Sequence, residues 1–272
     1  MFPVGLTIAG SDNSAGAGAQ ADLKTMSALG VYGVTAITCV VAEVPGKVSA
    51  IQAIEPRIVA EQIRLLFEAF PIGALKTGML YSCEIIDAVC DTLDGCLGKS
   101  SIRPPIVIDP VMVATSGDPL LKGDAVTLYR TRLFPLAALI TPNLDEVRTL
   151  LGRPVTSLDE MRIAGQELVA TYGRAFLIKG GHLQLNPAID LLCTPDGAVR
   201  EYSAPFIHGI STHGTGCTYA AAITAGLAKG LPLPEAVGEA KQYLANAVAH
   251  FLRWTHHGRT TDALHHFAPR PN

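Results

Sequence analysis

The sequence predicts an α/β fold: a mostly parallel central sheet with helices on both faces and an antiparallel hairpin at one edge. Short apolar, β-branched runs alternate with helical patterns along most of the chain, which is typical of βαβ units with right-handed crossovers. The 272 residues are 49% hydrophobic and 17% charged, enough apolar surface for a sizeable core. Long polar linkers and internal repeats are absent from the sequence. We therefore expect one domain over residues 1–272.

Strands and helices alternate through the first half of the chain. Gly30 ends the first predicted helix in the manner of a left-handed cap, and Pro56 occupies the first turn of the second. Pro71 closes that second helix. The predicted strands are residues 4–9, 34–41, 74–77 and 106–109, and the predicted helices are 19–29, 56–70, 82–97 and 124–133.

The second half continues the alternation and then changes. Residues 139–141 and 175–179 are predicted strands, and 144–151 and 158–172 are predicted helices. The turn composition of residues 194–197 (TPDG) predicts a hairpin between strands 189–193 and 198–202. Two last helices, 216–229 and 234–253, complete the prediction.

Polar residues follow five of the predicted strands. Because parallel sheets bind ligands beyond the carboxyl ends of their strands, these side chains indicate a site at one edge of the sheet. They are Asp12, Glu43, Asp109, Asn143 and Lys179.

Composition excludes several functional classes. The net charge of −3 provides no basic field for nucleic acid or for an anionic membrane. No apolar run approaches the roughly 20 residues of a membrane helix, and the N-terminal apolar run is too short for a signal peptide. Six cysteines without a Cys-x-x-Cys pair predict reduced thiols and a cytoplasmic location.

The segment His213–Thr218 (HGTGCT) precedes a strongly helical run of small residues. Glycines there let backbone amides converge at a helix N-terminus, where the dipole favours an anion such as phosphate. Tight packing is the alternative reason for such glycines. Cys217 at this position is expected to have its pKa lowered from about 8.5 toward neutrality. The alternatives are a small buried hydrophobe or a nucleophile paired with His213.

Two other motifs have ordinary structural explanations beside their functional ones. The loop of residues 10–18 is rich in glycine but lacks the Gly-x-Gly-x-x-Gly spacing, and the Walker pattern is absent from the sequence. Asn143 and Glu146 fit a capping box at the start of a helix. Asp109 before Pro110 fits a plain turn, and Lys179 fits a solvated strand end.

Six segments together resemble one enzyme family. In this order and spacing they are similar to the hydroxymethylpyrimidine and hydroxymethylpyrimidine phosphate kinases of thiamine biosynthesis, within the ribokinase-like superfamily. The match runs from about residue 4 to residue 266. HGTGC is its most specific part, because most ribokinase-like enzymes have aspartate where this chain has Cys217. The segments are AGSDNSAGAGAQADLKT (9–25), KTGML (76–80), IDPVMVATSGDPLL (108–121), TPNLDE (141–146), KGGH (179–182) and THGTGCT (212–218).

The resemblance implies an ATP- and Mg²⁺-dependent phosphotransferase and assigns roles by position. Cys217 matches the residue proposed to take the proton of the substrate hydroxyl, and the amides of Gly214, Thr215, Gly216 and Cys217 would surround the transferred phosphoryl group. Asp109 and Glu146 match positions around Mg²⁺. The positions that match ATP contacts are Asn143, Lys179, Thr215 and Lys241.

The resemblance also implies a pyrimidine pocket and a homodimer. The sequence departs from the family at Glu43, where glutamine is usual: an amide both donates and accepts, whereas an ionised carboxylate only accepts. Ala15 replaces a usual glycine, and Thr115 a usual lysine. The positions that match the pocket are Gly10, Asp12, Ala17, Asp22, Val41, Glu43, Met79 and Val111.

The expected reaction is phosphorylation of 4-amino-5-hydroxymethyl-2-methylpyrimidine, and then of its monophosphate, by ATP. A pyridoxal or pyridoxine kinase on the same scaffold is the nearest alternative. A non-catalytic pyrimidine-binding regulator and a hydrolase with Cys217 as nucleophile are alternatives of other classes.

Overall fold

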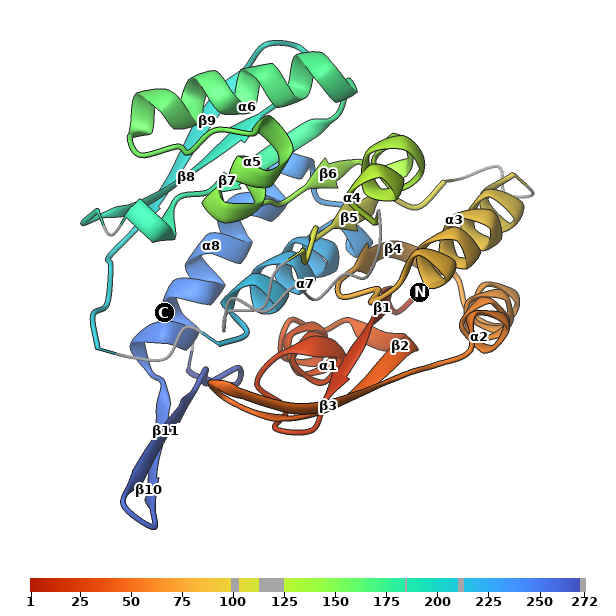
Figure 1. Cartoon of the computed structure of the whole chain (residues 1–272), viewed down its shortest axis with the longest axis horizontal. Coiled ribbons are helices and arrows are strands. Elements are labelled where there is room, and N and C mark those ends of the chain that lie inside the picture. The colour runs from red at the N-terminus through yellow and green to blue at the C-terminus, as the bar shows by residue number, and fades with distance from the viewer. Residues whose placement is uncertain (99–102, 113–124, 184, 210–212, 270–272) are drawn as a thin grey trace.

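A nine-stranded sheet forms the centre of the protein in the computed structural model, which describes residues 1–98, 103–112, 125–183, 185–209 and 213–269 (Figure 1). The strand order is β3-β2-β1-β4-β5-β6-β7-β8-β9. The six neighbouring strands β2, β1, β4, β5, β6 and β7 are parallel. The strands β3, β8 and β9 pair antiparallel at the two edges. The bounds are β1 Val4–Asp12, β2 Tyr32–Val44, β3 Lys47–Ala53, β4 Ile72–Thr77, β5 Ile106–Ile108, β6 Leu139–Ile140, β7 Ala175–Lys179, β8 Ala188–Cys193 and β9 Val199–Ala204.

Helices cover both faces of this sheet (Figure 1). Helices α1, α7 and α8 share one face, where α1 and α7 contact each other and the first strands. The remaining helices lie on the other face. The bounds are α1 Gly18–Ala28, α2 Pro56–Ala69, α3 Cys83–Leu97, α4 Ala125–Leu128, α5 Leu144–Leu151, α6 Leu158–Tyr172, α7 Thr215–Ala228 and α8 Leu233–Ala249.

Continuous apolar strands supply both layers of the core. In β5, Ile106 and Ile108 join the cluster under α2 to α6, while Val107 between them joins the cluster under α7 and α8. Successive side chains of a strand point to opposite faces, so a strand covered on both faces needs apolar residues at every position. None of the described helices is both long enough and apolar enough to span a bilayer.

The structure corrects the sequence prediction at three places. The sheet has a second antiparallel edge, β3, in addition to the predicted hairpin β8–β9. The last helix ends at Ala249 rather than at residue 253, and the chain then forms the hairpin of β10 (Leu252–His256) and β11 (Arg259–Ala263). His257 and Gly258 have φ of 48° and 72°, the left-handed pair of a tight hairpin turn. After α4, residues 129–133 form a π-helical turn instead of continuing the predicted α-helix.

Candidate active site

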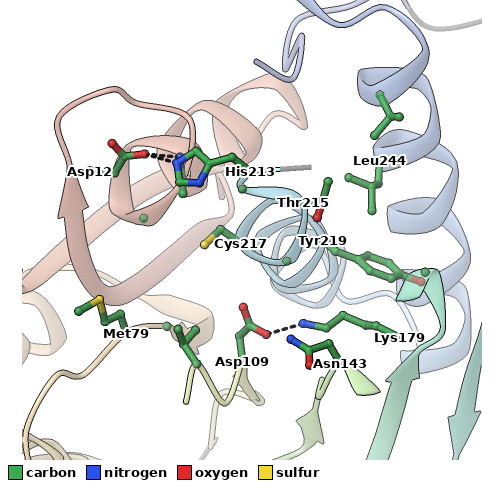
Figure 2. Close-up of a pocket in the computed structure, with 18 of the residues that line it drawn as sticks. Asp12, Met79, Asp109, Asn143, Lys179, His213, Thr215, Cys217, Tyr219 and Leu244 are labelled. Carbon is green, nitrogen blue, oxygen red and sulfur yellow. Dashed lines mark hydrogen bonds and ion pairs between the residues drawn. The ribbon is translucent and has the colours of Figure 1, made fainter. Parts of the chain in front are cut away.

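The carboxyl edge of the sheet opens into a cavity of about 740 Å³. The five polar residues predicted to meet at this edge all line it, and Figure 2 labels four of them, Asp12, Asp109, Asn143 and Lys179. The start of α7 also lines it, together with Lys241 of α8. The cavity therefore joins the predicted sheet-edge residues to the predicted anion-binding motif. Those five edge residues are Asp12, Glu43, Asp109, Asn143 and Lys179.

The start of α7 depends on a close backbone approach. Gly214 has φ +81°, and a Cβ there would lie 1.8 Å from the carbonyl oxygen of Gly16. Only glycine fits, because any side chain would collide with fixed backbone. Among the described residues no side chain caps α7 through a hydrogen bond, so its first-turn amides and dipole form an anion-binding end that faces the cavity.

Two carboxylates and a lysine lie at one end of the cavity. Lys179 Nζ donates to Asp109 Oδ1 at 2.8 Å, and Thr141 Oγ1 donates to the same oxygen at 3.1 Å. Glu146 Oε2 accepts the Asn143 amide at 2.7 Å, so the predicted capping box exists. Burial raises the pKa of Glu146 to about 8, against the lowering effect of Lys179, and the negative charge of Asp109 adds to the rise.

Lys241 lines the cavity beside a second buried carboxylate. Its Nζ donates to Asp190 Oδ2 at 2.6 Å, while Asp190 Oδ1 accepts the Gly180 amide at 2.9 Å. Asp190 thus fixes both the lysine and the turn that follows Lys179. The sequence interpretation did not include Asp190, because an aspartate inside a predicted hairpin strand carries no motif.

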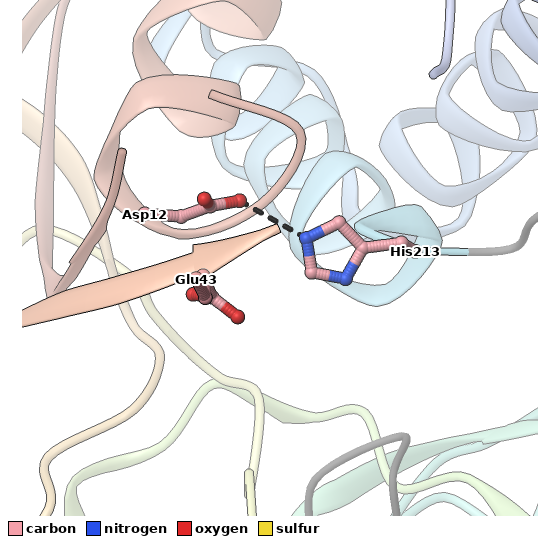
Figure 3. A group of neighbouring side chains, drawn as sticks. All are labelled: Asp12, Glu43 and His213. Atoms are coloured by element: carbon pink, nitrogen blue, oxygen red, sulfur yellow. Dashed lines mark hydrogen bonds and ion pairs between the residues drawn. The ribbon is translucent and has the colours of Figure 1, made fainter. Parts of the chain in front are cut away.

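Asp12, Glu43 and His213 form a polar cluster at the opposite end (Figure 3). His213 Nε2 lies 3.0 Å from Asp12 Oδ2. Asp12 also accepts the amides of Ser14 and Ala17, both at 2.7 Å. Burial alone would raise the pKa of Asp12, but these hydrogen bonds hold it at about 2.

The ionisable groups at this end of the cavity, where the acceptor alcohol is expected to bind, belong to the same cluster. The hydrogen bond with Asp12 raises the pKa of His213, and burial followed by the charge of Asp12 raises that of Glu43. One carboxylate oxygen each from Asp12 and Glu43 and one ring nitrogen of His213 lie within 4.8 Å of one another, a spacing that a metal ion could also bridge. Because both oxygens of Asp12 already accept N–H groups, we interpret the cluster as a hydrogen-bonded recognition surface.

Cys217 lies between these two ends in Figure 2. The expectation of a lowered thiol pKa is wrong: burial raises the pKa of Cys217 to about 11, although the positive charge of Lys76 and the amide of Gly18 oppose the rise. The helix N-terminus was predicted correctly, but burial outweighs it. Cys217 is therefore a thiol at neutral pH.

Asp22 is the one predicted pocket residue that does not line the cavity. Its side chain is fully buried, where its Oδ2 accepts from Thr7 Oγ1 at 2.6 Å and from Lys76 Nζ at 2.8 Å. The expectation that Asp22 lines the pocket is therefore wrong, because its side chain points from α1 toward the sheet. Lys76 was missed, since a lysine near a strand end resembles a solvated residue.

Two departures from the family pattern have different outcomes. Ala15 has φ 58°, the left-handed conformation that glycine adopts without strain, which explains why glycine is usual at this position. Thr115 lies outside the described residues, as do 113–124, so its expected effect on a phosphate contact stays a prediction.

A model of the phosphomethylpyrimidine kinase family matches residues 12–262. The chain belongs to this family. It is 45% identical over 269 residues to the hydroxymethylpyrimidine/phosphomethylpyrimidine kinase of Rhizobium meliloti, covering 98% of both chains. It is 44% identical to that of Escherichia coli, covering 90% of each. A thiamine biosynthesis bifunctional protein of Geobacter sulfurreducens is 43% identical, and the match covers 91% of this chain but 50% of that protein.

Solved structures confirm the ribokinase-like fold. A Bacillus subtilis pyridoxal kinase in complex with ADP has a TM-score of 0.87 at 33% identity, covering 98% of both chains. The phosphomethylpyrimidine kinase of Clostridium difficile has a TM-score of 0.78 at 38% identity, covering 90% of this chain and 99% of that one. The fold is thus common to kinases named for two different acceptors.

The close approach at Gly214 predicts a large functional loss in Gly214→Ala. The added Cβ would displace the start of α7 from the glycine-rich loop, and we expect kcat/KM for phosphoryl transfer to fall by at least about 100-fold, comparable with loss of an oxyanion donor. Gly230→Ala is the matched control, because Gly230 also has a positive φ, +87°, but open space around it. Equal losses in the two variants would show that backbone strain alone is responsible and would contradict the prediction.

Proposed function

We propose that this chain transfers the γ-phosphoryl group of ATP to 4-amino-5-hydroxymethyl-2-methylpyrimidine and then to its monophosphate. The observation that carries the proposal is the anion-binding start of α7, with Cys217 between the carboxylate–lysine end and the polar cluster of Asp12, Glu43 and His213. Family membership and the kinase names of the relatives support it. The cytoplasmic location predicted from the cysteines and the homodimer implied by the resemblance both stay predictions.

The residues at the carboxylate–lysine end fit a magnesium ion. Mg²⁺ prefers oxygen ligands, and Asp109 and Glu146 offer carboxylate oxygens beside the place where phosphates would meet α7. Burial is the main cause of the raised pKa of Glu146, and the repulsion from Asp109 that adds to the rise would be relieved by a divalent cation. When bound, the ion would neutralise phosphate charge. Lys179, Lys241 and Asn143 line the same end and would contact the nucleotide phosphates directly or through water.

At the other end the protein would orient the acceptor hydroxyl. Val41, Met79 and Val111 give the cavity apolar walls, while Glu43 and the Asp12–His213 pair supply polar contacts for an aminopyrimidine. Phosphoryl transfer needs positioning and charge stabilisation more than covalent chemistry. The hydroxyl proton would pass to the ionised form of Cys217, a small fraction of the thiol at neutral pH, as the oxygen bonds to the γ-phosphorus and the bond from that phosphorus to ADP breaks.

A pyridoxal kinase is the second candidate. The similarity to Bacillus subtilis pyridoxal kinase, with a TM-score of 0.87, favours it specifically. Glu43 bears on the choice, because a carboxylate can accept from an amino group or from a protonated ring nitrogen and cannot donate while ionised. Turnover with ATP would exclude the non-catalytic regulator, and a hydrolase would instead accumulate an acyl group on Cys217.

Three acceptors assayed in parallel test the proposal. Purified protein with ATP and Mg²⁺ is expected to turn over hydroxymethylpyrimidine and its monophosphate, each with higher kcat/KM than pyridoxal. Coupled measurement of ADP release gives the rates. Turnover of pyridoxal alone would establish the second candidate and overturn the first.

The thiol of Cys217 predicts that kcat depends steeply on pH. Because its thiol pKa is about 11, the ionised fraction grows about tenfold per pH unit below that value, and kcat is expected to rise with the same slope from pH 7 to 9. Cys217→Ala should lower kcat about 100-fold or more with little change in KM for ATP, since the anion-binding groups are backbone amides. In Cys217→Asp the slope should vanish, because an aspartate is ionised throughout this range. A slope that persists in Cys217→Asp would assign the titration to another group.

Glu43 predicts a pH-dependent affinity for the acceptor. Glu43→Gln should lower KM for hydroxymethylpyrimidine at pH 8 to 9, where the ring is unprotonated and an amide can donate to it. The advantage should shrink toward pH 6, where a proton can be shared with the carboxylate. KM values that are equal or higher in the variant at every pH would contradict proton sharing.

A further inference from the structure

A fully buried hydroxyl links the two strands that flank β1 at the acceptor end of the cavity. Thr38 of β2 is 0% exposed, and its Oγ1 donates to the carbonyl oxygen of Met79 at 2.7 Å. Met79 follows β4, and β1 lies between β2 and β4 in the strand order. The bond therefore crosses the carboxyl end of β1 and ties Met79 to a strand with which β4 does not pair.

A β-bulge places Thr38 at this crossing. The parallel pairing of β1 with β2 shifts register between Ala9 and Ser11. Two residues of β2, Thr38 and Cys39, therefore stand opposite Gly10 alone. Bulges redirect side chains and are over-represented beside active sites. The irregular register accounts for a strand side chain that bonds to backbone two strands away.

Gly10 leaves the room that this arrangement needs. A Cβ on Gly10 would lie 2.8 Å from Cys39 Sγ and 3.7 Å from Met79 Sδ. The first distance is too short for a real contact, so a side chain at Gly10 would displace Cys39. Gly10 and Met79 both line the cavity. We call these two residues the acceptor floor, and the hydroxyl of Thr38 is bound to its backbone from behind.

The backbone at Met79 is where the strand gives way to a turn. The amide of Gly78 still donates to the carbonyl of Ile8 at 2.9 Å. Two residues after Met79, however, Tyr81 has φ 71°, a left-handed conformation that is uncommon outside glycine and costs free energy. The hydrogen bond from Thr38 lies between these two points and fixes Met79 in place.

We propose that Thr38 is a positioning residue for acceptor binding, which holds Met79 of the acceptor floor against the aromatic ring of the acceptor. Figure 2 shows Met79 on the Asp12 side of Cys217, away from Lys179. A thioether packs favourably on an aromatic ring. Thr38 does not itself line the cavity, so it acts through Met79. The proposal rests on the proposed function, since it concerns the acceptor and not the nucleotide.

Thr38→Val tests the proposal, because valine has the shape of threonine and lacks the hydroxyl. Isothermal titration calorimetry of the full-length protein gives the Kd of hydroxymethylpyrimidine and, in a separate titration, that of ATP with Mg²⁺. The Kd of hydroxymethylpyrimidine is expected to rise at least about fivefold, the effect of one lost hydrogen bond, while the Kd of ATP stays unchanged. An unchanged acceptor Kd, or equal rises for both ligands, would overturn the proposal.

Thr38→Ser separates the hydrogen bond from packing. Serine keeps the hydroxyl, loses one methyl group, and should bind the acceptor as the wild type does. A weaker-binding Thr38→Ser would show that packing, and not the hydrogen bond, holds Met79. That result would refute the proposal even where the valine variant does not fold.

Thr25→Val is the matched control. Thr25 of α1 is also 0% exposed, and its Oγ1 donates to the carbonyl oxygen of Ala21 at 2.7 Å. Neither of these two residues lines the cavity, so both Kd values should stay unchanged. A rise in acceptor Kd as large as in Thr38→Val would make the effect a general consequence of losing a buried hydroxyl and would contradict the proposal.

The same titrations distinguish failure of this proposal from failure of the proposed function. Wild-type protein that binds pyridoxal and not hydroxymethylpyrimidine would show that the proposed acceptor is wrong, and the variants are then compared with pyridoxal. A selective loss of pyridoxal binding in Thr38→Val would still support the role of Thr38. An unchanged Kd of pyridoxal would refute it.

Discussion

The contact between Gly214 and the carbonyl of Gly16 holds the two halves of the site together. With φ +81° and room for no Cβ, Gly214 lets α7 begin directly against the loop that follows β1. Asp12, the last residue of β1, accepts the Ser14 and Ala17 amides of that loop and lies 3.0 Å from His213, just before α7. The acceptor end and the anion-binding end are therefore fixed to each other by backbone and not by long side chains. A hydroxyl and a phosphoryl group bound at the two ends would meet near Cys217.

Three lysine–aspartate pairs lie in or beside the cavity. Lys179–Asp109 and Lys241–Asp190 line the cavity, and Lys76–Asp22 lies beneath it. Each aspartate orients its lysine through a hydrogen bond before any ligand binds, which is the preorganisation that stabilises charge developing in a transition state. The cost is desolvation of buried charges. This arrangement suits transfer of a highly charged group and has no evident use in a passive binding protein.

The periodicity of apolar residues and the positions of glycine and proline were sufficient to predict the parallel core and the residues that meet at its edge. Buried strands have continuous apolar sequences, which makes them recognisable. The same signals failed at β3 and at β10–β11, whose side chains are mostly exposed. Lys76 and Asp190 were missed for a related reason: their burial depends on helices distant in sequence. The thiol of Cys217 shows the limit most clearly, since a helix N-terminus is visible in a sequence whereas the desolvation that dominates its pKa is not.

In the proposed reaction, one cavity moves a phosphoryl group from ATP to a pyrimidine alcohol and then to its phosphate. Phosphorus NMR of the protein with ATP, Mg²⁺ and hydroxymethylpyrimidine monophosphate tests this most directly, because it identifies the bond that forms. The expected products are equal amounts of ADP and a pyrimidine diphosphate, with the coupled signals of a new pyrophosphate linkage. ADP accompanied only by inorganic phosphate, or an unchanged monophosphate signal, would contradict it.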